Sequence, residues 1–390
     1  MKSPANTDEQ VLIKSYLSSN ELEKFELSGE DFHFIDGAVV LIIGIGNQIG
    51  RELVELLRNK GVARFVFVDC SEKALYDVVE ALEDKPLESS EVHYEIGDVA
   101  DEKWVRSIFE VYKPTVCFSF AAKTSVKLSN ISPEAFIATN IRGTLNVLKA
   151  ATDCPSMQVC IFISSEKANA PSSVYDVTKF CLDFLVRQTA SNVPRIRFGT
   201  LQLVNICSTE GSYFLRSLIE RVQKGKSIRL RVVNGQLPKR RFSCPSTAAK
   251  LFLRFAAFCR GGHAFGIWPS YVASIDVKSL ASLVCRELGI ADVDKFMEES
   301  ICFVDSLGEK VEEPLPDGAY HVPDMPLYLT PPPKIEAKWL WEKIDKLLVL
   351  SEDIKHRPEI MEIVKSIAVA ANSKSNGNGA SNPVLCSSGK

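Results

Sequence analysis

The sequence predicts an α/β protein of the Rossmann type, a doubly wound parallel sheet with a smaller C-terminal substrate-binding region. Three observations support this prediction: short apolar runs alternate with segments of helical periodicity, the runs are continuous rather than alternating, and a glycine-containing turn follows the first run. Continuous apolar strands imply burial on both faces of a parallel sheet. Strands that alternate with helices in this way are typical of a doubly wound fold.

Six apolar runs are the predicted strands. The segment after the first run places Ile49, Leu53 and Leu56 on one face of a helix, which gives that helix an apolar side to pack on the sheet. The runs cover residues 38–43, 65–69, 92–96, 115–120, 158–163 and 198–206.

The regions around these strands differ in composition. The stretch before the first strand carries short amphipathic pieces, a proline-rich section covers residues 314–334, and the last residues are small and polar, which is typical of disorder. The predicted regions are an N-terminal helical extension (1–36), the Rossmann domain (37–206), a substrate-binding region partly interwoven with it (207–345), a C-terminal helix (346–371) and a disordered tail (372–390).

Composition narrows the class of protein. A formal net charge of −3 argues against a nucleic-acid binder, which usually carries a basic excess. The sequence has no secretory signal pattern and no run of about 18 apolar residues, so we expect a cytoplasmic protein without a membrane span. The 11 cysteines are scattered and include Cys117 and Cys160 inside apolar runs, where a cysteine acts as a small core residue. With no C-x-x-C pair and five separated histidines, we expect no metal site.

A glycine turn between the first strand and the first helix predicts a dinucleotide site. Backbone N–H groups of such a turn can approach a pyrophosphate, whose charge the helix N-terminus favours. Asp69 ends the second strand, 19 residues after Gly50, where a carboxylate accepts hydrogen bonds from a ribose diol and repels a 2′-phosphate. We therefore expect NAD(P), with NAD favoured. The predicted cofactor-binding residues are Gly44, Gly46, Asn47, Gln48, Ile49, Gly50, Asp69, Asp98, Val99, Ala121, Ala122 and Lys179.

The glycine spacing, G-x-G-x-x-x-G, leaves Asn47 where many such loops carry glycine. Asparagine tolerates left-handed backbone angles better than most residues, so we expect Asn47 to complete the turn in that way. Its side chain would narrow the approach to the phosphates.

The stretch SSEKANAPSSVYDVTK follows the fifth predicted strand and carries the candidate chemistry. Ligands of a parallel sheet bind beyond the carboxyl ends of the strands, so Ser165, Glu166 and Lys167 should project into the crevice. Tyr175 and Lys179 are four residues apart and share a helix face. An ammonium beside a phenol lowers the pKa of the phenol, which would make Tyr175 a usable base near neutral pH.

These motifs resemble the extended short-chain dehydrogenase/reductase family, and within it the polysaccharide-biosynthesis branch that contains UDP-N-acetylglucosamine 4,6-dehydratases. The resemblance runs from about residue 36 to about residue 290. Besides SSEKANAPSSVYDVTK, the matching stretches include GDVAD, AAKTSVKLSNISPEAFIATNIRGTLNVLKAA and KRRFSCPSTAAKLF. The resemblance implies a nucleotide-sugar substrate and a homo-oligomer.

The resemblance also implies a mechanism. Tyr175, assisted by Lys179, would remove the proton of the sugar 4-hydroxyl while hydride leaves C4 for the nicotinamide. The 4-ketone acidifies the hydrogen on C5, Lys167 would act as base there, and Glu166 would act as acid for the departing 6-hydroxyl. Return of the hydride to C6 leaves a 4-keto-6-deoxy sugar. Two adjacent ionisable groups suit such work because their protonation states can differ within one pocket.

Four further residues lie where the resemblance implies contacts with the substrate. The resemblance implies contacts from Asn205 and Arg241 to the nucleotide and its phosphates, and a guanidinium suits a diphosphate. A solvated basic surface at KRRF is an equally good interpretation for Arg241. Thr124 and Ser125 follow the fourth strand, where relatives contact sugar and cofactor. The chain departs from the family pattern at Ile43, Asn47, Thr124, Glu166 and Gln202, where relatives carry threonine, glycine, lysine, aspartate and arginine.

Three functions remain open on sequence grounds. The first is a nucleotide-sugar 4,6-dehydratase, for which the resemblance implies a UDP-N-acetylhexosamine as substrate. The second is an NAD(P)-dependent 4-epimerase or reductase that uses Tyr175 and Lys179 without elimination. The third is a catalytically weakened cofactor-binding protein that serves as an interaction subunit. The Glu166–Lys167 pair favours the first, because simple epimerisation needs no second acid–base pair.

Overall fold

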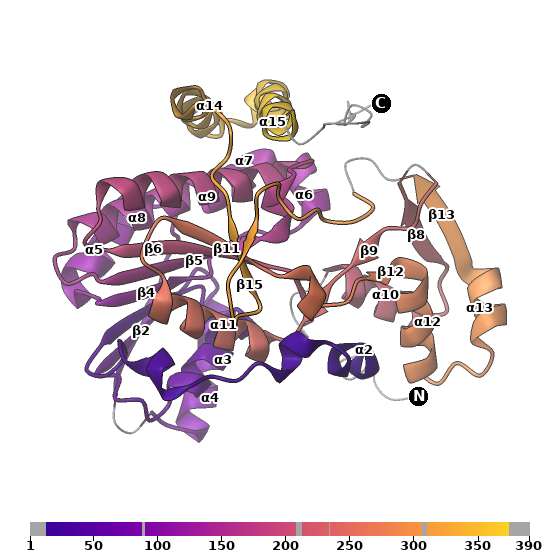
Figure 1. Ribbon diagram of the computed structural model, residues 1–390, viewed down its shortest axis with the longest axis horizontal. Coiled ribbons are helices and arrows are strands. Elements are labelled where there is room, and N and C mark those ends of the chain that lie inside the picture. The colour runs from indigo at the N-terminus through magenta and orange to yellow at the C-terminus, as the bar shows by residue number, and fades with distance from the viewer. Residues whose placement is uncertain (1–12, 88–89, 208–212, 234, 306–309, 374–390) are drawn as a thin grey trace.

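A nine-stranded sheet forms the centre of the molecule (Figure 1). The structure, a computed structural model, describes residues 13–87, 90–207, 213–233, 235–305 and 310–373. The strand order is β14-β15-β11-β6-β5-β4-β1-β2-β3; all neighbours from β11 to β3 pair in parallel, and β15 and β14 are antiparallel. The predicted Rossmann-type sheet is confirmed. Its strands are β1 (Val39–Ile43), β2 (Arg64–Asp69), β3 (Glu91–Ile96), β4 (Val116–Ser119), β5 (Val159–Ser165), β6 (Arg197–Leu203), β11 (His263–Ile267), β14 (Tyr320–His321) and β15 (Leu327–Thr330).

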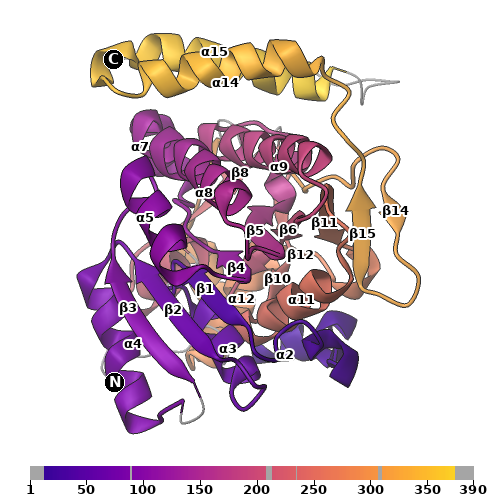
Figure 2. The same cartoon turned by 90° about the vertical axis from the view of Figure 1, so that its left-hand side faces the viewer.

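Helices cover both faces of this sheet, as its continuous apolar strands require. Figure 2 shows one layer above the sheet and another below it. Each layer closes its own apolar core, and Cys117 and Cys160 lie fully buried in the upper one. The lower layer contains α3 (Gln48–Leu57), α4 (Glu72–Asp84) and α11 (Pro245–Phe258), and the upper layer contains α5 (Glu102–Tyr112), α6 (Val126–Ile131), α7 (Pro133–Ile137), η3 (Ala138–Arg142), α8 (Gly143–Asp153) and α9 (Val174–Asn192).

The C-terminal region is a helical hairpin rather than the single helix predicted over 346–371. Helix α14 (Ala337–Leu350) ends before a turn, and α15 (Arg357–Asn372) runs back along it (Figure 2). Asp353 caps the short helix η6 (Ile354–His356) between them, which breaks the helical path. The hairpin packs on the upper layer, where Arg357 forms an ion pair with Glu134 of α7. Residues 374–390 of the predicted tail lie outside the described residues.

A second lobe lies beside the carboxyl ends of the strands (Figure 1). Tyr16 and Leu17 of α2 (Lys14–Ser18) are buried in its core, so the N-terminal extension is part of this lobe. The Tyr16 hydroxyl accepts a hydrogen bond from the Phe242 amide at 3.1 Å, which ties the extension to the chain that leads into the lobe. The elements of the lobe are α10 (Tyr213–Gln223), β8 (Ile228–Val232), β9 (Lys239–Arg240), β12 (Ile275–Asp276), α12 (Val277–Glu287), α13 (Val293–Ser300) and β13 (Ile301–Asp305).

Within the described ranges, no helix combines the length and the apolar character needed to cross a bilayer.

Candidate active site

The glycine turn, residues 44–50, joins β1 to α3 at the carboxyl edge of the sheet. Gly44 has a φ of +82°, and a Cβ placed there would lie 2.8 Å from the amide nitrogen of Ala121. Only glycine fits a position that combines a left-handed angle with so close a backbone neighbour. The Gly46 amide donates a 2.9 Å hydrogen bond to Asp69 Oδ2, which fixes the turn against the end of β2.

Asn47 does not have the left-handed conformation that its identity suggested. Its φ is −65° and its ψ is 134°, so this expectation was wrong. Asn47 is instead the N-cap of α3, and its side-chain oxygen accepts a hydrogen bond from the Ile49 amide at 2.9 Å. The first amides of a helix lack intrahelical partners, so the extended N-cap conformation is the stable one for this residue.

The residues around the turn fit a dinucleotide. The N-terminus of α3 opens at the carboxyl edge of the sheet, and Gln48 brings a buried Oε1 without a hydrogen-bond partner among the described residues. Asp69 Oδ1 accepts from the Ser71 amide, and Asp98 Oδ1 accepts from the Ala100 amide, both at 2.9 Å. The other predicted cofactor contacts lie nearby in the chain: Ile49 and Gly50 are buried in α3, Val99 is buried after β3, and Ala121 and Ala122 are half-buried after β4. Cofactor binding by these residues stays a prediction.

Strand β5 and helix α9 bring the predicted catalytic residues together. Ser165 is the last residue of β5, and Glu166 and Lys167 begin the short helix η4 (Glu166–Asn169). Ser173 caps α9 by accepting from the Asp176 amide at 3.1 Å, so Tyr175 lies in the first turn of that helix. All five predicted catalytic side chains therefore come from one strand end and the helix that follows it.

Tyr175 does not have the low pKa that the Y-x-x-x-K spacing suggested. Burial raises the pKa of Tyr175 to about 12, although a hydrogen bond with Ser165 and the charge of Lys167 act to lower it. Lys179 directs its ammonium to the backbone oxygen of Ile163 at 3.0 Å. The acidic phenol that the spacing predicts is not found, because loss of water around the phenol outweighs the nearby charges. The role of Tyr175 as a base stays a prediction.

Burial also changes the pKa of Lys179, lowering it to about 8, while the charge of Asp183 acts in the opposite direction. Asp183 lies one turn further along α9 and accepts a 2.7 Å hydrogen bond from Gln202. Gln202 stands where the family resemblance implies an arginine, and a neutral amide is compatible with this buried position.

Asn140 is a residue that the sequence analysis missed. It lies in the π-helical segment η3, where its side chain bonds both the N–H and the C=O of Lys123, at 2.9 and 3.0 Å. It also donates to the Thr178 hydroxyl at 2.9 Å. Asn140 thereby joins the loop after β4 to α9. A lone asparagine inside a helical segment gives no such signal in a single sequence.

Arg241 and Glu166 face each other across the site. Arg241 Nη1 lies 3.3 Å from Glu166 Oε2, and its Nη2 lies 2.7 Å from Glu312 Oε1. The side chain of Arg241 is only 12% exposed, which rules out a solvated basic surface at this residue. Burial, followed by the charge of Glu313, raises the pKa of Glu166 to about 7 against the opposite effects of Lys167 and Arg241.

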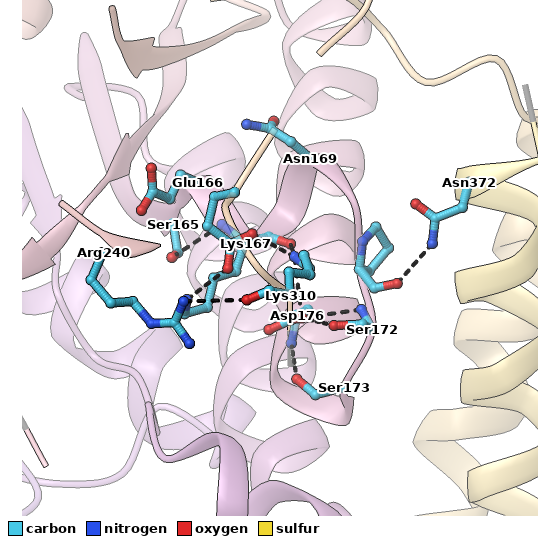
Figure 3. A network of polar contacts seen from close by, with 12 residues as sticks. Ser165, Glu166, Lys167, Asn169, Ser172, Ser173, Asp176, Arg240, Lys310 and Asn372 are labelled. Atoms are coloured by element: carbon cyan, nitrogen blue, oxygen red, sulfur yellow. Dashed lines mark hydrogen bonds and ion pairs between the residues drawn. The ribbon is translucent and has the colours of Figure 1, made fainter. Parts of the chain in front are cut away.

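Lys167 is held by a segment that lies far away in the sequence. Its ammonium lies 2.8 Å from Glu313 Oε1, while Lys310 lies 2.5 Å from the other oxygen of the same carboxylate. Lys310 also reaches within 3.6 Å of Asp176. Figure 3 shows Lys167, Lys310 and Asp176 grouped together, with the Glu166 carboxylate directed away from them. We call Glu166, Lys167, Arg241, Lys310, Glu312 and Glu313 the ionic cluster.

The remaining predicted substrate residues have structural contacts of their own. Asn205 donates to the backbone oxygen of Arg241 at 2.9 Å, which ties β7 (Asn205–Ile206) to the start of β10 (Phe242–Ser243). Ser125 caps α6 by accepting from the Leu128 amide at 3.3 Å. Thr124 is exposed. Of these three, only Asn205 lies beside a member of the ionic cluster.

A cavity of about 540 Å³ borders the ionic cluster through Lys310 and Glu312. Its other walls include Asp183 and Arg187 of α9 and the proline-rich residues 314–317. Tyr175, Lys179 and Lys167 are not among its lining residues, although Ala168, which follows Lys167, is.

The chain is similar to several curated proteins. It is 26% identical over 231 residues to the probable polysaccharide biosynthesis protein EpsC of Bacillus subtilis, which covers 59% of this chain and 38% of EpsC. It is 27% identical over 352 residues to the uncharacterized membrane protein MJ1061 of Methanocaldococcus jannaschii, covering 86% of this chain and 98% of that protein. A UDP-N-acetylglucosamine 4,6-dehydratase (inverting) of Campylobacter jejuni is 29% identical over 132 residues, 33% of this chain and 39% of the enzyme.

Two solved structures share the fold. Pen from Bacillus thuringiensis has a TM-score of 0.65 and 23% identity, over 78% of this chain and 90% of Pen. DesIV, a dTDP-glucose 4,6-dehydratase from Streptomyces venezuelae, has a TM-score of 0.59 and 17% identity in a complex with NAD, over 71% of this chain and 87% of DesIV. The family described as polysaccharide biosynthesis protein matches residues 40–321, which include the glycine turn, α9 and the ionic cluster. The chain belongs to this polysaccharide biosynthesis protein family.

Proposed function

We propose that this protein is a nucleotide-sugar 4,6-dehydratase with bound NAD(P), acting on a UDP-N-acetylhexosamine. The observation that carries the proposal is the convergence of Ser165, Glu166 and Lys167 with Tyr175 and Lys179 at the carboxyl end of β5. The similarity to dehydratases from Campylobacter jejuni and to the fold of DesIV supports it. The glycine turn and Asp69 would hold the cofactor, and the Asp69 carboxylate favours NAD over NADP.

Each residue of the site has a separate role in the proposed reaction. The bound nicotinamide supplies a hydride acceptor that later returns the hydride. Tyr175 holds the proton of the sugar 4-hydroxyl, and Lys179 fixes the start of α9 against β5 through the Ile163 carbonyl. Glu166 and Lys167 act as an acid–base pair for the loss of water across C5 and C6, and Arg241 meets the diphosphate.

The test is incubation of the purified full chain with UDP-N-acetylglucosamine, followed by mass spectrometry of the sugar. A loss of 18 mass units (one water, roughly) with no net accumulation of NADH supports the dehydratase. Tyr175→Phe should block this product because the 4-hydroxyl proton has no acceptor. No turnover across a panel of nucleotide sugars, with cofactor bound, would instead favour a protein whose catalysis has been lost.

A 4-epimerase is the second candidate, and one observation favours it. The Glu313 carboxylate pairs with the ammonium of Lys167, and a protonated amine cannot take the proton from C5. An epimerase needs only Tyr175 and Lys179 for proton transfer at the 4-hydroxyl. The same incubation separates the two functions, because epimerisation leaves the mass unchanged and alters the configuration at C4.

A further inference from the structure

Lys167 lies in an environment that fixes its ammonium group. The Glu313 carboxylate bridges two ammonium groups, with one oxygen 2.8 Å from Lys167 and the other 2.5 Å from Lys310. Glu313 is buried, and each lysine side chain is only 16% exposed. Removing one partner of a buried ion pair leaves a charge without compensation, so these contacts constrain each other strongly.

The charges that face Lys167 mostly favour its protonated state. Burial disfavours the ammonium, but Glu313 has the largest opposing effect, and the net result is that the pKa of Lys167 is raised well above its usual range. The same contacts hold the pKa of Glu313 well below its usual range, against the effect of burial. The ionisable groups that face Lys167 are Glu313, Arg240, Asp176, Glu166, Lys310 and Tyr175.

Glu166, the adjacent residue, also has a raised pKa, but its pKa falls near neutral pH. Its carboxylate lies against Arg241 at 3.3 Å and points away from the Lys167–Lys310 contacts (Figure 3). Because burial raises the pKa of Glu166 to about 7, both its protonated and its ionised forms are populated near neutral pH. A group in this state can accept a proton and later give it back.

We propose that Glu313 is a positioning residue that holds Lys167 as an ammonium, so that Lys167 protonates the departing 6-hydroxyl and Glu166 removes the proton from C5. This inference rests on the proposed dehydratase function. It reverses the roles that the family resemblance implies for the two residues. Glu313 touches neither sugar nor cofactor in this scheme and acts through its contact with Lys167, while its charge also raises the pKa of Glu166.

The protons and electrons of this scheme balance. The proton on C5 passes to Glu166, and the electron pair of the C5–H bond forms the enolate of the 4-ketone. The enolate then forms the C5–C6 double bond as the C6–O bond breaks, and the leaving hydroxide takes a proton from Lys167 to become water. The hydride taken from C4 then adds to C6, and Glu166 returns its proton to C5. Tyr175 begins this cycle as its phenolate, and the proton that it takes from the 4-hydroxyl passes to Lys167, which restores both side chains. Tyr175 and Lys167 are close enough for the charge of the lysine to act on the phenol.

The state of Lys167 can be measured without a substrate. Competitive acetylation of the full chain with acetic anhydride between pH 7 and 10, read by peptide mass spectrometry, reports the unprotonated fraction of each lysine. In Glu313→Gln, burial lowers the pKa of Lys167 without the opposing charge of Glu313. Lys167 should therefore react at least about tenfold faster at pH 8, which is the effect of one pKa unit. Glu312→Gln is the matched control, since Glu312 contacts Arg241 instead, and it should label like the wild type.

Glu313→Asp keeps the charge and should restore much of the protection, which distinguishes positioning from a loss of folding. Unchanged labelling of Lys167 in a folded Glu313→Gln protein would overturn the proposal. This result does not depend on which sugar is the substrate. The failure of every nucleotide sugar to react would therefore contradict the proposed function while the labelling still decided the role of Glu313.

Deuterium exchange separates the two catalytic roles. In D₂O with UDP-N-acetylglucosamine, Lys167→Gln should incorporate deuterium at C5 of the recovered sugar without losing water, because Glu166 can still remove the proton after C4 is oxidised. Glu166→Gln should neither exchange nor eliminate. Exchange that persists in Glu166→Gln and disappears in Lys167→Gln would show that Lys167 is the base, and would overturn the assignment.

Discussion

In the glycine turn, the contact that ties the turn to the neighbouring strand joins residues 23 apart, from the Gly46 amide to Asp69. In the ionic cluster, Lys167 meets Glu313 across 146 residues and Arg241 meets Glu166 across 75. Both regions lie at the carboxyl edge of the same sheet. One is closed by neighbouring βα units, whereas the other requires the chain to pass through the second lobe and return.

The two regions also depend on different forces. Besides the Gly46–Asp69 hydrogen bond, the glycine turn is held by backbone geometry and by the lack of room for a side chain at Gly44, neither of which changes with pH. The ionic cluster is held by buried charges whose protonation does change with pH. We therefore expect steric substitutions to damage the turn and charge substitutions to change the pH behaviour of the cluster.

The largest effect should come from Gly44→Ala. The new Cβ would lie 2.8 Å from the Ala121 amide at a φ of +82°. The left-handed angle costs about 1–2 kcal/mol and overpacking about 1–3 kcal/mol more, so we expect a total loss of roughly 4 kcal/mol in the free energy of unfolding. Urea denaturation followed by circular dichroism measures it.

Gly37→Ala is the matched control for this substitution. Gly37 has a φ of +70° but no atom within 4 Å of an added Cβ, so only the backbone cost of about 1–2 kcal/mol applies. Equal losses in the two variants would show that the close contact of the new Cβ with the Ala121 amide does not lower the free energy of unfolding.

Glu166→Gln should give the next largest effect, and one that depends on pH. A carboxyl group whose pKa is raised by folding stabilises the protein when protonated, and this stability is lost as the pH rises from the unfolded value through the folded one. A rise from 4.5 to about 7 corresponds to roughly 3 kcal/mol. The glutamine stays neutral, so the variant should match the wild type near pH 5 and exceed its stability by roughly 2–3 kcal/mol at pH 8.

Urea midpoints of both proteins at pH 5, 6, 7 and 8 test this expectation. A constant difference between them across the series would show that the Glu166 carboxyl does not titrate in this window.

The contrast between local and long-range contacts explains what the sequence could predict. Strands such as 158–163, found as Val159–Ser165, are continuous apolar runs whose burial on both faces follows from composition. Ser165, Glu166, Lys167, Tyr175 and Lys179 share one strand end and one helix, so their convergence follows from spacing. The position of the glycine turn follows in the same way.

The remaining features depend on tertiary contacts that one sequence does not display. The conformation of Asn47 was decided by an unpartnered helix amide rather than by its own left-handed tolerance. The pKa of Tyr175 was decided by burial rather than by Lys179. Glu313 lies in VEEPLP, an acidic pair before prolines, and nothing in that pattern shows that one carboxylate would lie 2.8 Å from Lys167.

The smallest effect should come from Asn47→Ala, a substitution within the glycine turn that removes a hydrogen bond without steric conflict. The substitution removes the side-chain acceptor of the Ile49 amide and leaves the backbone angles unstrained, because φ is −65° and ψ is 134°. Loss of an N-cap costs about 1 kcal/mol, whereas glycine at an N-cap costs only a few tenths. We therefore expect Asn47→Ala to lower the free energy of unfolding by about 1 kcal/mol and Asn47→Gly by less.

If Asn47 instead needed a left-handed angle, the order would be the same but the alanine loss would approach that of Gly37→Ala plus the lost cap, roughly 2–3 kcal/mol. Urea midpoints for the three proteins decide between these values.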